Sequence, residues 1–293
     1  MKPTITLIIN TYNQADYLAR VLRAVSRQRD LPDEVIIADD GSGGETRLVF
    51  QQWSAGQPFA ARHIWQKNEG FRRSHILNAA IADSHSQYLV FLDGDTVPHP
   101  LFVSDHRALA RSGFFLQGHR VCVQQRASVH FGAGDFFADR RRAFLAGQMR
   151  GLKHAFRWPT PCRRIMSSLA GVRGCNLSVW REDLAGINGY NQDYFGWGCE
   201  DLDLALRLMN FGIRRMDVRG RALCFHLWHP PLDRSFLAAN EKILDQTVAH
   251  KSTACERGLN LHLNNRPCAV WQQSNLPAQH GDAKTMAPAL PSG

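Results

Sequence analysis

The chain has 293 residues, of which 44% are hydrophobic and 21% are charged, and its 35 Lys and Arg exceed its 26 Asp and Glu to give a formal charge of +9. This composition suits one large α/β domain, or a domain with a small appendage, and the charge favours anionic partners: nucleotides, nucleic acids or an acidic membrane surface. The seven cysteines include no CxxC pair, and no apolar run approaches the roughly 20 residues that span a bilayer, which argues against a disulfide framework, a structural zinc site and a transmembrane segment.

Strands and helices alternate over the first hundred residues. Short apolar runs predict strands at residues 4–9, 34–38, 61–66 and 87–92. Apolar positions at helical spacing predict helices over residues 15–28, 44–54 and 74–83. This order indicates parallel strands with helices on both faces of the sheet, an arrangement in which ligands bind outside the carboxyl ends of the strands.

Three polar clusters follow directly after predicted strands. They are Thr11-Tyr12-Asn13, Asp39-Asp40 and Asp93-Gly94-Asp95. Because the carboxyl ends of parallel strands meet at one edge of the sheet, we expect these loops to converge on a single site.

The rest of the chain is less regular. Residues 171–181 predict a further strand, and residues 199–211 and 235–250 predict helices. Residues 139–164 hold eight Arg and Lys, interleaved with Phe, Leu and Met. From about Asn265 the sequence has Pro, Gln, Ala and Ser without periodicity, which predicts a disordered tail.

Asp93 and Asp95 carry the first chemical signal. Two carboxylates two residues apart at a strand end can share a Mg²⁺ or Mn²⁺ ion that binds a diphosphate, because hard cations prefer oxygen ligands. In a sugar transfer, such an ion neutralises the charge that develops on the departing nucleoside diphosphate. The DxD pattern alone is weak, since many loops contain it by chance.

A second signal lies in residues 188–207, NGYNQDYFGWGCEDLDLALR. Glycines separate four aromatic residues, and the loop runs into Glu200-Asp201 at the start of a predicted helix. An acidic pair is favourable at a helix N-terminus on dipole grounds alone. The combination with aromatic rings favours a functional interpretation, in which the rings support a sugar and a carboxylate takes the proton from an acceptor hydroxyl.

Together these motifs resemble family 2 glycosyltransferases of the GT-A fold. The matching segments run from about residue 4 to residue 231 in the family's order: IINTYNQADYLARVLRAV, EVIIADDGS, NEGFRRSHILNAAI, YLVFLDGDTVPHP, GCNLSVWRED and NGYNQDYFGWGCEDLDLALRL. The last is also similar to the C-terminal motif of β-1,4-galactosyltransferases and of bacterial chondroitin-polymerase-like enzymes. The resemblance implies an α/β fold with a Rossmann-like, mostly parallel central sheet flanked by helices.

The resemblance also implies which residues bind the nucleotide. They are Thr11, Tyr12, Asn13, Asp39, Arg72, Asp93 and Gly94. Asp39 would hold a uracil ring, Asp93 would contact the ribose or the metal, and Asp40 and Ser42 would shape the turn. Arg73 remains an alternative to Arg72 for the nucleotide or its diphosphate.

Further roles follow on the acceptor side. The resemblance implies that Asp201 is the catalytic base, that Glu200 binds donor or acceptor hydroxyls and that Trp197 stacks on a sugar. Asn176 would lie near the donor sugar.

The resemblance implies that a metal ion is held by Asp95 and by a histidine after the last core strand. His226 fits that position best, and His229 is the alternative. An imidazole ligand favours Mn²⁺ over Mg²⁺.

The sequence departs from the family pattern in two places. Arg73-Ser74-His75-Ile76 stands where small residues and an Arg-Asn pair are usual, with Asn78 displaced. Cys199 replaces a glycine before the acidic pair. The first departure is what leaves the choice between the two arginines open.

We expect the chain to divide into three parts. Residues 1–232 would form the glycosyltransferase domain, with a nucleotide-binding half at 1–100 and an acceptor-binding half at 101–232. Residues 233–264 would be a helical extension and residues 265–293 a disordered tail. The basic segment 139–164 is either an ordinary solvated helical face or a contact with anionic lipid headgroups.

The sequence thus predicts a cytoplasmic, inverting, metal-dependent transferase, attached at most to the inner face of the cell membrane. It would move a hexose or N-acetylhexosamine from a UDP-sugar to an oligosaccharide or lipid-linked glycan in lipopolysaccharide, capsule or other surface polysaccharide synthesis. A nucleotidyltransferase should instead show a Gly-rich, Lys- or Arg-bearing loop after the first strand, where this chain reads NTYNQAD. A basic nucleic-acid-binding protein would not need the carboxylates at the strand ends, and no nucleic acid is expected.

Overall fold

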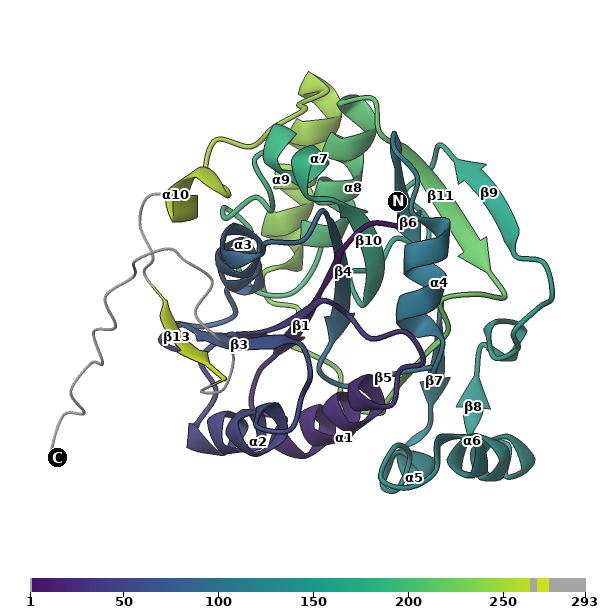
Figure 1. Cartoon of the computed structure of the whole chain (residues 1–293). Helices are drawn as coiled ribbons and strands as arrows, with labels where there is room; N and C mark the ends of the chain where they lie inside the picture. Colours follow the sequence, from purple (N-terminus) through teal and green to yellow (C-terminus); the bar gives the residue numbers. More distant parts are fainter. Residues whose placement is uncertain (1, 264–267, 274–293) are drawn as a thin grey trace, which may run out of the picture.

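A nine-stranded mixed sheet forms the centre of the computed structural model, which describes residues 2–263 and 268–273 (Figure 1). Its strand order is β13-β3-β2-β1-β4-β10-β6-β11-β9. The bounds are β1 Ile5–Thr11, β2 Glu34–Asp39, β3 Ala60–Trp65, β4 Tyr88–Asp93, β6 Phe114–Gln117, β9 Cys162–Met166, β10 Asn176–Trp180, β11 Arg214–Arg219 and β13 Ala269–Gln272. The predicted α/β class is confirmed.

Helices lie on both faces of this sheet. Their bounds are α1 Ala15–Ser26, α2 Gly44–Ser54, α3 Arg73–Asp83, α4 Phe102–Leu109, α5 Gln125–Ser128, α6 Phe136–Leu145, α7 Arg181–Gly186, α8 Glu200–Asn210, α9 Leu237–His250 and α10 Asn260–Leu263, with a 3₁₀ turn η1 at Leu152–His154. Within the described ranges, no helix has both the length and the apolar character needed to cross a membrane.

Strands β3, β2, β1 and β4 run parallel, as the alternation of elements predicts. Helices α1 and α2 cover one face of these strands and α3 covers the other (Figure 1). Leu7 and Ile9 of β1 pack into the core under α1, whereas Ile8 packs into the core under α3. Since successive side chains of a strand point to opposite faces, burial of both faces explains why the first strand is an unbroken apolar run.

Beyond β4 the sheet becomes antiparallel in part, because β10 runs antiparallel to both β4 and β6. The strand predicted at 171–181 is shorter than expected and begins only at Asn176. The residues before it form a turn in which Gly171 has a φ of 81° and the N–H of Gly174 donates to Asp201. A side chain of the acidic motif therefore takes the hydrogen bond that a longer strand would have used.

A second, four-stranded sheet was not expected from the sequence. Its order is β5-β12-β7-β8, with bounds β5 Thr96–Pro98, β7 Arg120–Val123, β8 Met149–Arg150 and β12 Cys224–His226. Strands of two to four residues carry too little periodicity to be recognised. This sheet matters for the site, because the pairing of His226 with Thr96 brings the end of β12 beside Asp95.

The expectation of a disordered tail is wrong for residues 269–272. They form β13, which pairs antiparallel with the edge strand β3. Trp271 of β13 packs against His63 and Trp65, so the strand has an aromatic anchor as well as its ladder. The remainder of the predicted tail, like residues 264–267, lies outside the described residues.

Asn78 of α3 holds the loop around Tyr190 in place, and replacing it tests how much this contact stabilises the fold. Its buried side chain donates to the carbonyl of Tyr190 and accepts from the N–H of Tyr190, both at 2.8 Å. The change Asn78→Ala should lower the free energy of unfolding by about 1–3 kcal/mol for each backbone group left unpaired. Thermal denaturation would measure this. Asn210→Ala, which removes one half-buried bond to Ser252, is the control, and an equal loss in both variants would contradict this role.

Candidate functional site

The loops that follow β1, β2 and β3 are tied together at the carboxyl edge of the sheet. Asn13, at a φ of 48°, donates its N–H to the hydroxyl of Ser42 and accepts from the N–H of Gly43. Tyr12 is exposed, and its hydroxyl accepts from the side chain of Asn68. The structure thus brings the predicted nucleotide-binding residues of the first loop beside the second and third loops.

The carboxylates of Asp39 and Asp40 both accept hydrogen bonds from the backbone of these loops. The carboxylate of Asp39 is fully buried, accepts from the N–H of Ser42 and contacts His63 Nε2 at 2.8 Å. Asp40 accepts from the N–H of Arg72, and burial raises the pKa of Asp40 to about 6. The two carboxylates shape the turns at this edge. His63 was not predicted, because its position inside β3 gives no sign of a polar role.

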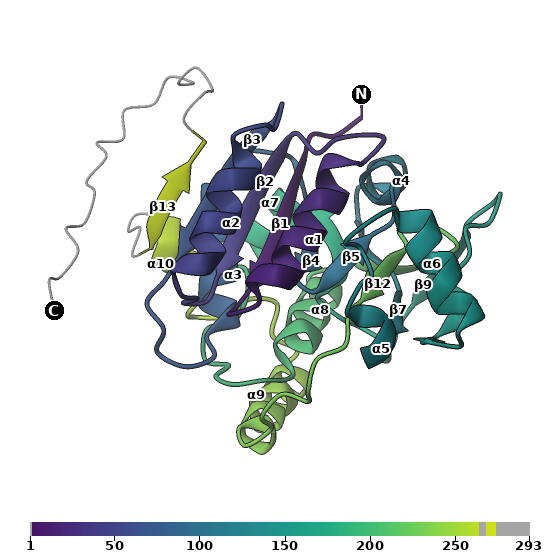
Figure 2. The same ribbon diagram turned by 90° about the horizontal axis from the view of Figure 1, so that it is seen from below.

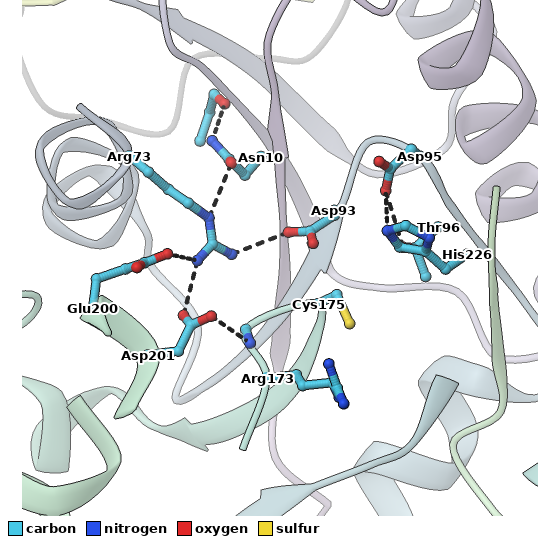
Figure 3. Close-up of polar contacts among 12 residues, drawn as sticks. Asn10, Arg73, Asp93, Asp95, Thr96, Arg173, Cys175, Glu200, Asp201 and His226 are labelled. Carbon is cyan, nitrogen blue, oxygen red and sulfur yellow. Dashed lines mark hydrogen bonds and ion pairs between the residues drawn. The ribbon is translucent and has the colours of Figure 1, made fainter. Parts of the chain in front are cut away.

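The guanidinium of Arg73 lies at the centre of the acidic motifs (Figure 3). It donates to Asp93 Oδ1 at 3.0 Å, to Glu200 Oε1 at 3.0 Å and to Asp201 Oδ1 at 2.8 Å. Its Nε donates to Asn10 Oδ1. By contrast, Arg72 turns outward to pair with Glu69. Of the two candidate arginines, Arg73 is therefore the one that the structure places at the acidic centre.

Glu200 and Asp201 occupy the first turn of α8 but differ in exposure. Glu200 is buried, and this burial together with the neighbouring Asp201 raises the pKa of Glu200 to about 7, against the opposing effect of Arg73. Asp201 keeps 20% of its side chain exposed and is oriented by the N–H of Gly174 at 2.7 Å as well as by Arg73. Asp201 is thus the member of the pair that a substrate can reach.

Asp95, His226 and His229 form a second cluster. Asp95 Oδ1 lies 3.6 Å from His226 Nε2, and Asp95 Oδ2 lies 3.5 Å from His229 Nε2. One ligand atom from each of the three residues falls within 4.8 Å of the others. Both histidines weighed in the sequence therefore reach Asp95.

The chemistry of these donors fits a divalent cation. Burial and the charge of Arg120 lower the pKa of His226 to about 3, so its imidazole is neutral at physiological pH and offers a lone pair. His229 Nδ1 lies 2.7 Å from the carbonyl of Pro230, which can only accept, so this nitrogen carries the proton and Nε2 is free to ligate. One carboxylate and two imidazoles suit Mn²⁺ better than Mg²⁺.

Asp93 and Asp95 do not face the same centre. Asp93 ends β4 and points to Arg73, whereas Asp95 precedes β5 and points to His226 (Figure 3). Between them, Gly94 donates its N–H to the carbonyl of Asn10, and a side chain at Gly94 would collide with Thr11 Oγ1 at 2.9 Å. That hydroxyl is buried and has no hydrogen-bond partner among residues 2–263 and 268–273.

Asn176 lies in the interior and leaves no group for a sugar. Its amide nitrogen donates to the carbonyls of His119 and Ala222, and its oxygen contacts His106 Nε2 at 3.1 Å. The side chain is fully buried. It holds β10 to the second sheet, so its position does not match the expected contact with the donor sugar.

The aromatic loop is partly core and partly surface. Tyr190 and Tyr194 are buried, which leaves Phe195 and Trp197 to face a ligand. The guanidinium carbon of Arg234 lies 5.1 Å from the centroid of the Trp197 ring. Gly198 has a φ of 114°, a conformation that a side chain disfavours, and its carbonyl accepts from Asn240 of α9.

Two cations of the site went unrecognised in the sequence. Arg120 of β7 lowers the pKa of His226 and has Cys175 Sγ as its side-chain contact at 3.7 Å. The charge of Arg173, a residue labelled in Figure 3, also lowers the pKa of His226, and Arg173 is exposed. Neither lies in one of the motifs quoted above, and only the folded chain reveals that both are close to His226.

Comparisons with known proteins bear on this geometry. The profile described as glycosyl transferase family 2 matches residues 6–161, and the profile described as the N-terminal domain of galactosyltransferase matches residues 161–229. Validoxylamine A glucosyltransferase from Streptomyces hygroscopicus subsp. limoneus is 23% identical over 93% of this chain and 60% of its own length. Chondroitin synthase from Escherichia coli is 23% identical over 84% of this chain and 38% of its own length. The chain thus spans less than two thirds of the length of each of these relatives.

Solved structures show the same fold at low identity. The mannosyltransferase PcManGT from Pyrobaculum calidifontis, in complex with GDP-Man and Mn²⁺, superposes with a TM-score of 0.55 at 20% identity, covering 90% of this chain and 68% of its own. TarS from S. aureus gives a TM-score of 0.61 at 13% identity, covering 88% of this chain and 41% of its own. The fold is the GT-A fold of these transferases.

The neighbouring arginines of α3 allow a matched test of the acidic centre. Arg73→Met should lower the free energy of unfolding by about 3–5 kcal/mol, because it leaves buried carboxylates without their cation. Arg72→Met breaks a partly exposed pair with Glu69 and an exposed hydrogen bond to the carbonyl of Lys67, and it should cost about 1 kcal/mol. Urea denaturation would measure both.

A double variant distinguishes loss of charge balance from general misfolding. Glu200→Gln combined with Arg73→Met should recover part of the loss, because one of the repelling charges is removed. Equal losses of stability in Arg73→Met and Arg72→Met would show that Arg73 does not hold the acidic centre together.

Proposed function

The chain belongs to glycosyl transferase family 2, and we propose that it is an inverting, divalent-metal-dependent enzyme that transfers a hexose or N-acetylhexosamine from a UDP-sugar to a glycan hydroxyl. One observation carries the proposal. A partly exposed, oriented carboxylate at Asp201 and a cluster of Asp95 with two histidines flank the same Arg73–Asp93 pair. A base on one side and a metal site on the other are the parts that direct displacement of a diphosphate requires.

Asp201 would act as the base. Its two oxygens accept from Arg73 and from the N–H of Gly174, which fixes the orientation of the carboxylate plane. An acceptor hydroxyl beside Asp201 would lose its proton as it attacks the anomeric carbon from the face opposite the diphosphate. Configuration inverts, and no covalent enzyme intermediate is needed. Trp197 would support a sugar ring near this carboxylate, and Glu200 would bind a sugar hydroxyl.

Asp95, His226 and His229 would hold the metal ion. When bound, the ion neutralises charge on the departing diphosphate. Arg120 and Arg173, whose charges already act on His226, would attract the same phosphates from the protein side. Mn²⁺ is proposed over Mg²⁺ because of the imidazoles; the solved complex of PcManGT with GDP-Man and Mn²⁺ supports a divalent metal.

The nucleotide would bind across the loops of residues 1–100. Thr11, Tyr12 and Asn13 lie beside the turn of Asp39 and Ser42, and we propose that uracil and ribose contact this edge. Residues 101–232 would supply the acceptor side. The acceptor is proposed to be an oligosaccharide or lipid-linked glycan of lipopolysaccharide, capsule or another surface polysaccharide, a proposal to which the likeness to chondroitin synthase lends support.

Asp201→Asn is the direct test of the base. The amide keeps the size of the side chain but cannot take a proton, so transfer should fall by about 10²–10⁴-fold while UDP affinity changes little. Mass spectrometry of product formed from a panel of UDP-sugars with Mn²⁺ would measure transfer. Asp193→Asn, an exposed carboxylate of the same loop, is the control. Normal turnover of the Asp201 variant would refute the assignment.

Removal of the imidazole ligands tests the metal site separately. His226→Ala and His229→Ala should each weaken Mn²⁺-dependent UDP binding by at least about tenfold, since losing even an outer partner of a metal ligand costs roughly 10–100-fold. Calorimetry with and without Mn²⁺ would measure the difference, and the exposed His130→Ala is the control. UDP binding that is independent of Mn²⁺ in the unchanged protein would contradict the proposed metal site.

A further inference from the structure

Residues 126–165 form a surface that the proposed transfer reaction does not use, which we call the basic–apolar face. This segment holds nine Arg and Lys against two Asp, so it carries +7 of the chain's formal charge of +9. Its elements α5, α6, β8, η1 and β9 lie together along one side of the molecule, away from β13 (Figures 1 and 2). The positive charge of the protein is therefore concentrated on one side.

Most of these cations are free of acidic partners. Asp139, one of the two acidic residues of the segment, accepts from the N–H of Gly132 and lies 3.8 Å from Arg142. Arg157 pairs with Asp105. Within the described part of the chain, no carboxylate pairs with Arg126, Arg141, Arg150, Lys153, Arg163 or Arg164. Six unpaired cations on one side produce a strong positive potential.

The same face exposes large apolar side chains. It holds eight of the eighteen exposed large hydrophobic residues found among residues 2–263 and 268–273. They are Val129, Phe137, Phe144, Leu145, Leu152, Phe156, Trp158 and Ile165. Leu145 is 76% exposed and Ile165 is 60% exposed. A solvated basic helix gains nothing from such residues, so their presence indicates contact with an apolar phase.

Helix α6 shows how the two properties are combined. Its buried side faces the protein through Phe136, Asp139 and Ala143. Phe137, Arg141, Phe144 and Leu145 follow one another at spacings of four, three and one, so they share the opposite, outward face. A helix with cations and apolar rings on its outward face is suited to lie at a lipid–water interface.

A cavity at the edge of this face adds a place for an anion. It has a volume of about 240 Å³ and lies where α1 meets the loop before α6. Arg23, Arg27 and Arg29 line it together with Phe136 and Phe137. One acidic residue, Asp135, also lines it, and its carboxylate accepts from the N–H of Ala138. Arg27 donates to the carbonyl of Gly134 at 2.8 Å, which ties the wall of the cavity to the basic–apolar face. Cations beside apolar rings match a phosphate headgroup joined to an acyl chain.

We propose that the basic–apolar face binds the surface of an anionic lipid bilayer. A nucleic acid would use the cations but would not need the exposed Leu145 and Ile165, and an acidic protein would not need so many cations without fixed partners. The face lies close to the reaction centre. His226, Cys122 and Arg150 share one register row across β12, β7 and β8, so Arg150 lies about 10 Å from His226 at the usual strand spacing. Bilayer contact would therefore hold the site near a membrane-bound acceptor.

Vesicle flotation of the full chain tests the proposal without donor, acceptor or metal, so its result is independent of the proposed transfer reaction. The protein should float with vesicles of phosphatidylglycerol and phosphatidylcholine at least tenfold more than with phosphatidylcholine alone. Raising the salt from 0.1 to 1 M should release it, because the Debye length falls from about 10 to 3 Å. Equal flotation with both vesicles, or none with either, would overturn the proposal.

Matched variants locate the contact. Arg141→Glu with Lys153→Glu should reduce binding by at least tenfold, because each cation near an anionic surface contributes roughly fivefold. Arg181→Glu with Lys242→Glu makes the same change of charge at exposed positions outside the face and should retain most of the binding. Leu145→Ser should also weaken binding, whereas Leu48→Ser, at another exposed leucine on α2, should not.

The variants also separate the other occupants of this face. If the charge-reversed variant and its control bind vesicles equally, the face is not the lipid contact. The lipid proposal is also wrong if the protein does not bind vesicles but binds an RNA oligonucleotide through this face. The same holds if it does not bind vesicles and sedimentation shows that two copies of the chain associate through this face.

Discussion

Three carboxylates from two elements meet on the guanidinium of Arg73, and the rest of the site depends on this convergence. Asp93 ends β4, whereas Arg73 begins α3 and Glu200 begins α8, so the contact joins three element ends. Two like charges 4 Å apart repel by about 4 kcal/mol at an effective dielectric of 20. The acidic motifs could not share this edge of the sheet without a cation between them. Burial and the neighbouring charge of Asp201 keep the pKa of Glu200 raised even with Arg73 present.

The parallel half of the fold and the identity of the acidic residues could be predicted from the sequence. Strands buried on both faces appear in the sequence as unbroken apolar runs. The polar residues of the site stand out because they follow directly after these runs. The short strands β5, β7, β8 and β12 and the added strand β13 could not be predicted, because their existence depends on pairing with distant segments. The same limit applies to Asn176, whose motif suggested a ligand contact but whose amide is used within the core.

The structure also separates two residues that the sequence placed together. Asp93 and Asp95 are two positions apart, yet β4 belongs to the large sheet and β5 to the small one, with Gly94 at the transition. The chain changes sheets within this motif, so one carboxylate faces the arginine and the other faces the histidines. A DxD motif read from sequence suggests two ligands for one ion. Here the local fold assigns one carboxylate to charge balance and leaves the other for a cation.

The small sheet links these features to the outer surface. His226 belongs to the cluster of Asp95 and two histidines. It is joined through Cys122 to Arg150 by consecutive strand pairings. Each pairing fixes the distance between strands through backbone hydrogen bonds, so it does not depend on the conformation of any long side chain. The orientation of the basic side of the molecule relative to the histidines is therefore set by the ladder itself. A surface that docked through α6 and β8 would hold Asp95 and His226 at a fixed depth, which is what a transferase acting on a surface-bound acceptor would require.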